Sequence, residues 1–211
     1  MTISRRQFIG GGVSLGASIL TSSPSSITYP TAKPASIIPH SLPEVPPAIS
    51  RALDALAGHA SRIPFRDRIA VADYGLNSGQ PRFHIVNVEM GAIGESYLVS
   101  HGRGSDPENT GLVQHFSNRP GSNASSSGSF LTANTYVGKH GKSRRLEGLD
   151  EENDLAWDRA IVIHGAEYVD GAMAEMQGRV GRSLGCFAFE RGRIAEVLER
   201  LGPGRLLYST K

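Results

Sequence analysis

A short apolar run at residues 160–166 constrains the fold of this chain more than any other feature of the sequence. Its β-branched centre, Ile161, Val162 and Ile163, is typical of a buried strand, and His164 lies near the end of that strand. Further β-rich runs occur before and after it, bounded by turns that contain glycine or proline. The sequence therefore predicts a mainly β fold that presents functional side chains at strand ends and on loops.

The predicted sheet is largely antiparallel and is accompanied by a few short helices. Residues 68–74 and 82–89 are separated by a hairpin-type connection, and residues 93–100 continue the meander. Apolar residues at helical spacing predict helices at residues 48–59 and 191–201. Further strands are expected at residues 130–138, 160–166 and 205–208, and further helices at residues 169–177 and 150–160, the last with Asp150 as its cap and Trp157 on its apolar side.

The only cysteine in 211 residues, Cys186, follows a glycine and lies 22 residues after His164. A single cysteine cannot form a disulfide within the chain, so its presence is explained either by nucleophilic chemistry or by burial. Gly185 allows a sharp turn and a close approach of substrate to the backbone N–H groups. Arg182, Ser183 and a nearby histidine could favour the thiolate. From these residues alone, a buried structural cysteine on a strand and a catalytic thiol carry about equal weight.

Two blocks, His164-Gly165 and Ser183-Leu-Gly-Cys186, resemble the H-G…S-x-G-C signature of the L,D-transpeptidases, the YkuD-like cysteine enzymes that cross-link peptidoglycan. Residues 160–189 as a whole are similar to the murein L,D-transpeptidase catalytic domain. The resemblance covers roughly residues 48–208 and implies an L,D-transpeptidase-type β-sandwich or barrel with a few short helices. Other similar stretches lie at residues 72–74, 100–104, 116–121 and 136–141.

The resemblance implies acyl transfer with Cys186 as the nucleophile and His164 as its base. The thiol would attack the carbonyl of the third residue of a tetrapeptide stem and expel the terminal D-alanine. N–H groups of the Gly185 turn would stabilise the oxyanion, and an amine from a second stem would resolve the thioester into a 3→3 cross-link. A main-chain carbonyl near Gly165 would orient the imidazole, and Ser183 would either bind substrate or brace the loop.

Other residues are candidates for substrate contact, and the chain departs from the family at two positions. His-Gly pairs occur at His101, His140 and His164; His164 is favoured as the base because it ends the most apolar strand and lies one helix before Cys186, and His101 and His140 are the alternatives. Leu184 stands where many relatives have histidine or tyrosine, and Ala188 stands where many have arginine, so another cation would have to bind the stem carboxylate. The candidates for substrate binding are Arg182, Gly165, Phe130, His101, Lys139 and His140.

The first 47 residues differ in composition from the remainder and predict export. Residues 1–23 resemble a twin-arginine signal, with Arg5 and Arg6 before an apolar run too short to cross a bilayer. An ordinary secretory signal is the alternative. Residues 24–47 are rich in proline, serine and threonine and are expected to form a linker, which leaves residues 48–211 as the catalytic domain. We therefore expect an exported protein of the periplasm or cell envelope.

Charge and motif patterns exclude several other functions. The formal charge of +2 is accounted for by Arg5 and Arg6, so the remainder is neutral, which argues against nucleic acid and against an electrostatic hold on a membrane. The seven histidines lack metal-ligand spacing and no phosphate loop is present, so no metal and no cofactor are expected. The expected partners are peptidoglycan stem peptides. An L,D-carboxypeptidase or other hydrolase on the same scaffold, and a non-catalytic wall-binding module, are the alternatives.

Overall fold

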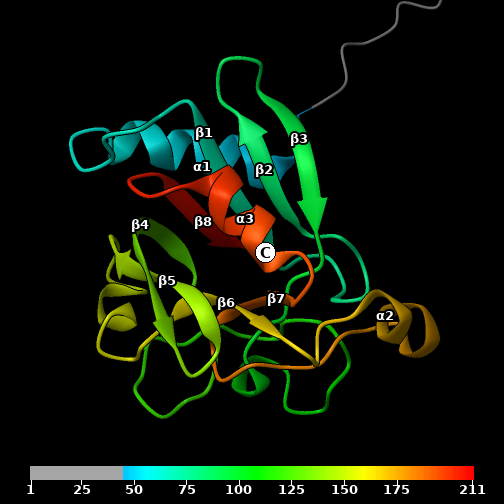
Figure 1. The fold of residues 1–211 in the computed structure, drawn as a ribbon. Helices are drawn as coiled ribbons and strands as arrows, with labels where there is room; N and C mark the ends of the chain where they lie inside the picture. Colours follow the sequence, from blue (N-terminus) through cyan, green and yellow to red (C-terminus); the bar gives the residue numbers. More distant parts are fainter. Residues whose placement is uncertain (1–44) are drawn as a thin grey trace, which may run out of the picture. The chain divides into compact units, whose positions relative to one another are not determined.

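The computed structural model describes residues 45–211, so the expected export signal and nearly all of the expected linker lie outside the described residues. Figure 1 shows the arrangement of the strands and helices. The strands are β1 (Arg68–Asp73), β2 (Phe83–Asn87), β3 (Ala92–Tyr97), β4 (Gly128–Gly138), β5 (Gly141–Gly148), β6 (Val162–Ala166), β7 (Phe187–Glu190) and β8 (Leu206–Thr210). The helices are α1 (Pro47–Gly58), α2 (Gly171–Gln177) and α3 (Ile194–Leu201), with 3-10 turns η1 (Arg103–Ser105) and η2 (Asp154–Ala156).

The strands form one mixed sheet in the order β3-β2-β1-β8-β4-β5-β6-β7. Neighbouring strands are antiparallel except for the pairs β1–β8 and β6–β7, which are parallel. The N–H of Ser100, just beyond β3, donates to the carbonyl of Ala188 in β7 at 2.9 Å, so the two ends of the sheet approach each other. The prediction of a mainly β fold with a few short helices is confirmed.

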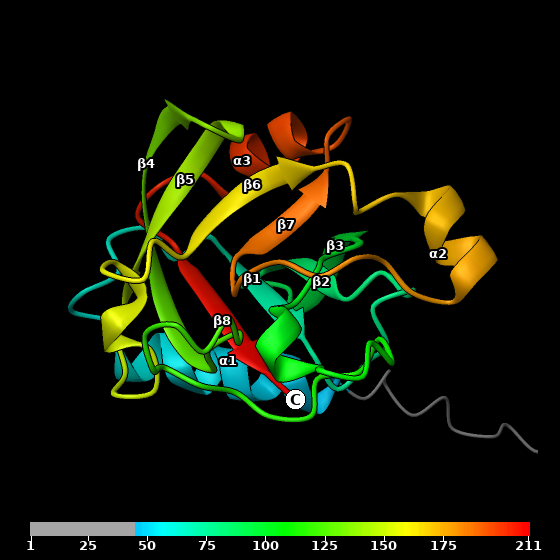
Figure 2. The ribbon, with the colours of Figure 1, turned by 90° about the horizontal axis from the view of Figure 1, so that it is seen from below.

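Apolar side chains fill the space on both faces of the central strands. In β1, Ala70 and Ala72 contribute to the main core, whereas Ile69 and Val71 point to the other face, as side-chain alternation in a strand requires. The second face is covered by α1, whose Ile49 is 1% exposed (Figure 2). Strand β1 is therefore buried on both sides, which explains its continuous apolar sequence.

Aromatic residues connect the main core to the end of the sheet that contains β6 and β7. The rings of Phe83 and Phe189 meet edge to face with centroids 4.7 Å apart, and those of Phe130 and Phe187 do so at 5.5 Å. Helix α3 packs on the same core through Val197, Leu198 and Leu201. Strand β6, which carries His164, and strand β7, which follows Cys186, are thus anchored in the main core.

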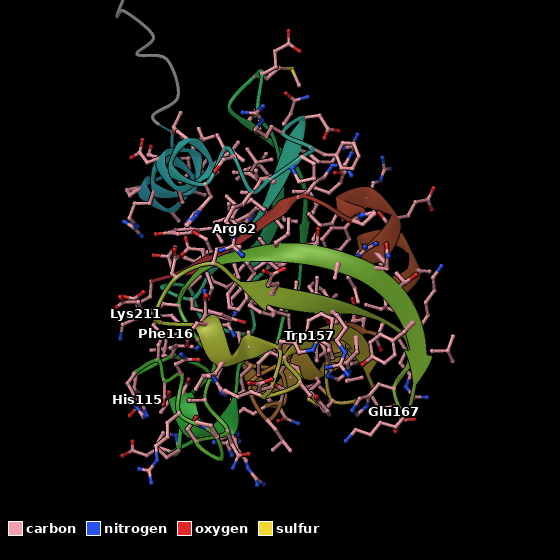
Figure 3. All side chains as sticks on the ribbon, turned by 90° about the vertical axis from the view of Figure 1, so that its left-hand side faces the viewer. Arg62, His115, Phe116, Trp157, Glu167 and Lys211 are labelled. Atoms are coloured by element: carbon pink, nitrogen blue, oxygen red, sulfur yellow. The ribbon has the colours of Figure 1, made fainter. Side chains whose placement is uncertain are left out.

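Two local expectations were wrong. Residues 150–160 form only the short turn η2, and Trp157 is 51% exposed, with the guanidinium of Arg145 5.1 Å from its ring centroid (Figure 3). The Asp150 carboxylate does not cap a helix; it accepts the N–H of Ser129 at 2.6 Å and pairs with His59 at 2.7 Å.

None of the helices between residues 45 and 211 combines the length and the apolar character that crossing a membrane requires.

Candidate active site

The parallel register of β6 and β7 decides which side chains meet at the site. Ile163 pairs with Phe187, and both belong to the main core. The next pair, His164 and Ala188, therefore faces the opposite side, because side chains alternate along a strand. Cys186 immediately precedes Phe187, and its thiol is contacted by the N–H of Val162. The thiol therefore lies beside β6, two register positions before the pair that contains His164.

A tight turn presents Cys186 at the start of β7. Gly185 has φ +114°, and a Cβ at this position would come within 2.7 Å of the carbonyl oxygen of Ala124, so only glycine fits. The Ser183 hydroxyl accepts the N–H of Gly185 at 3.1 Å and donates to the carbonyl of Cys186 at 2.7 Å. Ser183 is 3% exposed, and these contacts make it a brace of the turn.

The thiol is partly exposed and lies among groups with opposite effects on its ionisation. Its Sγ atom lies 3.6 Å from the carbonyl oxygen of Ala160. Burial raises the pKa of Cys186, while the N–H of Val162 and the charges of Lys139 and Arg159 act to lower it. Burial is the largest of these effects, so the resting thiol is protonated at neutral pH.

The imidazole of His164 is oriented by the main chain. The ring is 2% exposed, and Nδ1 lies 2.9 Å from the carbonyl oxygen of Gly165. A carbonyl can only accept, so Nδ1 carries the hydrogen and Nε2 is the nitrogen that can take up a proton. Gly165 itself allows α3 to pack closely, since a Cβ there would lie 3.1 Å from the Cγ2 atom of Ile194.

A second histidine covers the first. The exposed ring of His140, in the turn between β4 and β5, stacks on His164 with centroids 4.2 Å apart and an interplanar angle of 23°. Burial lowers the pKa of His164, and the nearby positive charges of His140 and Lys139 lower it further. His164 is therefore neutral at pH 7. Of the residues predicted to bind substrate, His140 stacks on the imidazole, and the charge of Lys139 acts on both the imidazole and the thiol.

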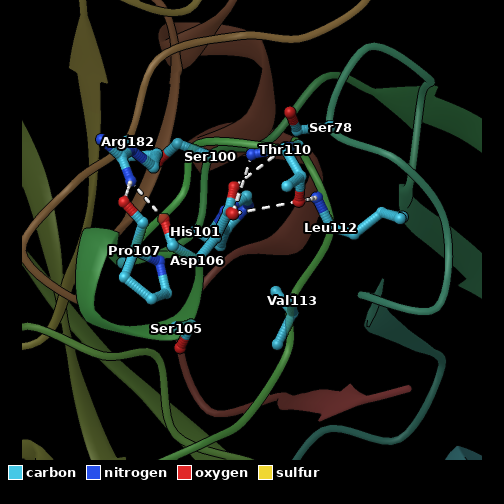
Figure 4. A network of polar contacts seen from close by, with 12 residues as sticks. Ser78, Ser100, His101, Ser105, Asp106, Pro107, Thr110, Leu112, Val113 and Arg182 are labelled. Carbon is cyan, nitrogen blue, oxygen red and sulfur yellow. Dashed lines mark hydrogen bonds and ion pairs between the residues drawn. The ribbon is translucent and has the colours of Figure 1, made fainter.

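A buried polar cluster supports the thiol turn from within. The Arg82 guanidinium donates to Nδ1 of His101 at 2.7 Å, so the opposite nitrogen, Nε2, carries the hydrogen and donates to the Asp106 carboxylate at 3.1 Å. All three side chains are 0% exposed. Figure 4 shows His101 beside Asp106. The His101 carbonyl in turn accepts the N–H of Ser183 at 2.8 Å. The cluster is thus joined directly to the turn that carries Cys186.

The family model of the L,D-transpeptidase catalytic domain matches residues 45–209. The chain belongs to this family. The matched residues include His164, within β6, and Cys186, which immediately precedes β7. A comparison with curated proteins finds no match.

Solved structures of L,D-transpeptidases are similar at low identity. One is an enzyme from Mycobacterium smegmatis, at 13% identity and a TM-score of 0.43 over 69% of this chain and 59% of that chain. A second is LdtMt1 in complex with imipenem, at 13% identity and a TM-score of 0.40 over 68% of this chain and 59% of that chain. A third, from Xylanimonas cellulosilytica, has 14% identity and a TM-score of 0.38 over 74% of this chain and 68% of that chain. This chain thus spans 59% of the length of the first two structures.

Three residues predicted to contact substrate in this L,D-transpeptidase domain have other roles. Phe130 is 0% exposed and packs in the main core, so that prediction is corrected. His101 is equally buried and is held by Arg82 and Asp106, so it cannot reach a substrate directly. Arg182 donates to the main-chain oxygens of Asp106 and Pro107 (Figure 4). These bonds hold its guanidinium on the protein rather than in the site.

Sequence reasoning missed Arg159, whose charge acts on Cys186. The residue immediately precedes the buried run that forms β6, and that position is the only signal the sequence offers. A charged residue at the start of a strand usually marks a solvent-exposed strand end, so the position of Arg159 in the sequence does not by itself indicate a role. Packing of the loop at residues 117–126 against the thiol turn is what brings Arg159 into the site.

Cavities and metal ligands add little to this picture. A cavity of about 640 Å³ is lined by residues 115–122, and one of about 490 Å³ lies at the β1–β3 end of the sheet near Arg200. Neither is lined by Cys186 or His164. Lys211 lies near His115 and Phe116 (Figure 3), and its ammonium donates to the carbonyl of Gln114 at 2.6 Å. Within residues 45–211, no three side chains converge as a metal site would require.

Proposed function

We propose that this protein is a peptidoglycan L,D-transpeptidase that forms 3→3 cross-links between tetrapeptide stems through a Cys186 acyl-enzyme. The observation that carries the proposal is the parallel pairing of β6 and β7, which brings Cys186 beside β6 two register positions from His164, with the charge of Lys139 acting on both groups. The imidazole has its Nδ1 hydrogen directed to Gly165, which leaves Nε2 to act as the base. The family match supports the same chemistry.

The two reacting groups start uncharged. Burial raises the pKa of Cys186 and lowers that of His164, so thiol and imidazole are both neutral at pH 7. The sulfur attacks the carbonyl carbon of the third stem residue as its proton passes to His164. The Gly185 N–H is bonded to Ser183, so the Cys186 N–H is our candidate donor to the oxyanion.

Collapse of the tetrahedral intermediate completes the first half-reaction. The bond to the terminal D-alanine breaks, and its amine takes the proton from His164, which leaves a thioester on Cys186. The amine of an acceptor stem then attacks the thioester and gives its proton to His164. When that intermediate collapses, the thiolate leaves and recovers the proton, and the new amide is the cross-link.

Mass spectrometry of products tests this proposal. The full chain is incubated with disaccharide-tetrapeptide, and cross-linked dimers with release of D-alanine are expected. Cys186→Ala and His164→Ala should each lower product formation by about a thousandfold or more, because the first variant lacks the nucleophile and the second lacks the base. The matched control His115→Ala removes an exposed imidazole that lies outside β6, β7 and the thiol turn, and should leave the rate unchanged. Full activity in either site variant would contradict the assignment.

Hydrolysis by the same acyl-enzyme is a second candidate. Leu184 beside the thiol is 55% exposed and His140 is exposed, so water has a path to the thioester. An L,D-carboxypeptidase would give tripeptide and no dimer in the same assay. A wall-binding module without catalysis would give neither product. In that case Cys186 would also resist acylation by imipenem and would react with alkylating reagents no faster than an unfolded thiol.

Export to the cell envelope is part of the proposal, since peptidoglycan stems are found there. It rests on residues 1–23, whose arginine pair resembles a twin-arginine signal. Replacing Arg5 and Arg6 by lysine should retain the protein inside the cell, as measured by cell fractionation. Unchanged export would indicate an ordinary secretory route.

A further inference from the structure

Arg159 is a half-buried cation that makes no bond to a carboxylate within residues 45–211. Its Nη1 donates to the carbonyl of Ser117 at 2.8 Å and to the hydroxyl of Ser126 at 2.5 Å. Its Nη2 donates to the carbonyl of Ala124 at 2.6 Å and contacts the Ser122 hydroxyl at 3.4 Å. Among the ion pairs within residues 45–211, none includes Arg159. Charges removed from water are normally paired, so the counter-charge has to come from elsewhere.

The guanidinium lies against the turn that presents the thiol. Its Nη2 would be 3.3 Å from a Cβ placed on Gly185, the residue just before Cys186. The following residue, Ala160, directs its carbonyl oxygen to within 3.6 Å of the sulfur. Ala160 holds the left-handed conformation at φ +54°, which is unfavourable for a residue other than glycine. The segment is therefore held in a specific shape beside the reacting atom.

We propose that Arg159 is a positioning residue whose charge stabilises the Cys186 thiolate while its fork of donors clamps residues 117–126 against the thiol turn. This inference rests on the proposed function, in which a thiolate forms as His164 takes up the proton. The developing negative charge is then the missing partner of the guanidinium. The interaction is reciprocal: Arg159 acts to lower the pKa of Cys186, and the thiolate acts to raise that of Arg159.

Other titratable groups surround the sulfur and must be separated from this effect. Lys139, from the β4–β5 turn, is the second cation that acts on Cys186, but it is exposed and therefore screened by solvent. Tyr74 and Tyr168 also interact with the thiolate, and burial raises the pKa of each to about 12, so both stay neutral. His164 is the proton acceptor itself. Of the two cations that act on Cys186, Arg159 is thus the one better shielded from water.

Alkylation of Cys186 by iodoacetamide between pH 5 and 10 tests the proposal. The reagent is neutral, so its rate reports the thiolate fraction without a charge effect of its own. Arg159→Gln should react about tenfold more slowly than the wild-type chain at pH 7, the size expected when an opposite charge near a thiolate is removed. Arg159→Lys, which keeps the charge and loses the fork, should stay within about threefold of the wild-type rate.

Two comparisons make the result decisive. Arg200→Gln removes the same charge from α3, where Arg200 pairs with Glu95 at 3.4 Å, and should leave the rate unchanged. Rates in urea should be equal for all chains. An unchanged rate in Arg159→Gln, or equal slowing in both Arg159 variants, would overturn the charge role. The alkylation assay needs no stem peptide. If Arg159→Gln slows alkylation of Cys186 but the wild-type chain forms no cross-links, only the proposed function is refuted.

Discussion

At the scale of single residues, the site combines a thiol whose pKa is raised with an imidazole whose pKa is lowered. Burial keeps the Cys186 thiol protonated and the His164 imidazole unprotonated, so the ion pair forms during attack rather than beforehand. His140 stacks on His164 and shields it, but it also carries a positive charge in acid. The pH dependence of turnover should therefore reflect both rings.

His140→Phe tests the coupling of the two rings. His164 must be neutral to accept the thiol proton, and its pKa lies below the ordinary 6.5 through burial and through the charges of His140 and Lys139. Phenylalanine keeps the stacked ring and removes the charge, so the pKa of His164 should rise and the acid limb of kcat/KM should move to higher pH. A pH profile of product formation measures this. A shift to lower pH, or the same shift in a His115→Phe control, would contradict it.

At the scale of elements, the decisive piece is the turn between residues 183 and 186. Its conformation depends on the positive φ of Gly185 and on both hydrogen bonds of the Ser183 hydroxyl. The turn joins β7, which runs parallel to β6, and this pairing sets Cys186 two register positions from His164. A change in the turn should therefore affect both stability and activity.

Gly185→Ala should lower the free energy of unfolding by about 2–3 kcal/mol, from backbone strain together with the clash against Ala124. Equilibrium unfolding in urea measures the change. Gly192→Ala is the matched control, because a Cβ there meets nothing within 4 Å and should alter stability by less than about 0.5 kcal/mol. Similar losses in the two variants would show that Gly185 is not constrained as described.

At the scale of the whole molecule, a buried ionic cluster connects the sheet to the site. Arg82 belongs to the segment leading into β2, and Asp106 accepts the N–H groups of Thr110 and Gly111 besides contacting His101. Burial and the charge of Arg82 lower the pKa of His101 to about 4. The cluster is therefore intact only while this imidazole is neutral.

This cluster predicts loss of stability in acid. Above pH 6.5, His101 is neutral in both the folded and the unfolded chain, so its contribution is complete. As the pH falls toward the folded value of about 4, only the unfolded chain takes up the proton, and on the order of 3 kcal/mol should be lost. His101→Gln keeps a donor and an acceptor without titrating, so urea unfolding should depend less on pH. The same pH dependence as in the wild-type chain would contradict this, with His115→Gln as the control.

Part of this organisation could be predicted from local sequence. Alternating and β-branched runs predicted most strands, because burial selects such residues wherever they lie. Strand β5 was missed, since its sequence is largely charged and becomes a strand only by pairing with β4 and β6. The helix expected at residues 169–177 begins instead at Gly171, because the Asp170 carboxylate accepts the N–H of Met173 and caps it.

The sequence by itself determined the mainly β class, the glycine turn before the only thiol, and that His164 belongs to a buried strand, because each depends on neighbours within a few residues. His164 was expected near the end of that strand and is instead its central residue. The tertiary structure alone decided that Phe130 and His101 are buried, that Arg182 is bonded to the main chain, and that Arg159 reaches the thiol turn. These outcomes follow from strand register and loop packing between segments far apart in the chain, which local patterns do not encode.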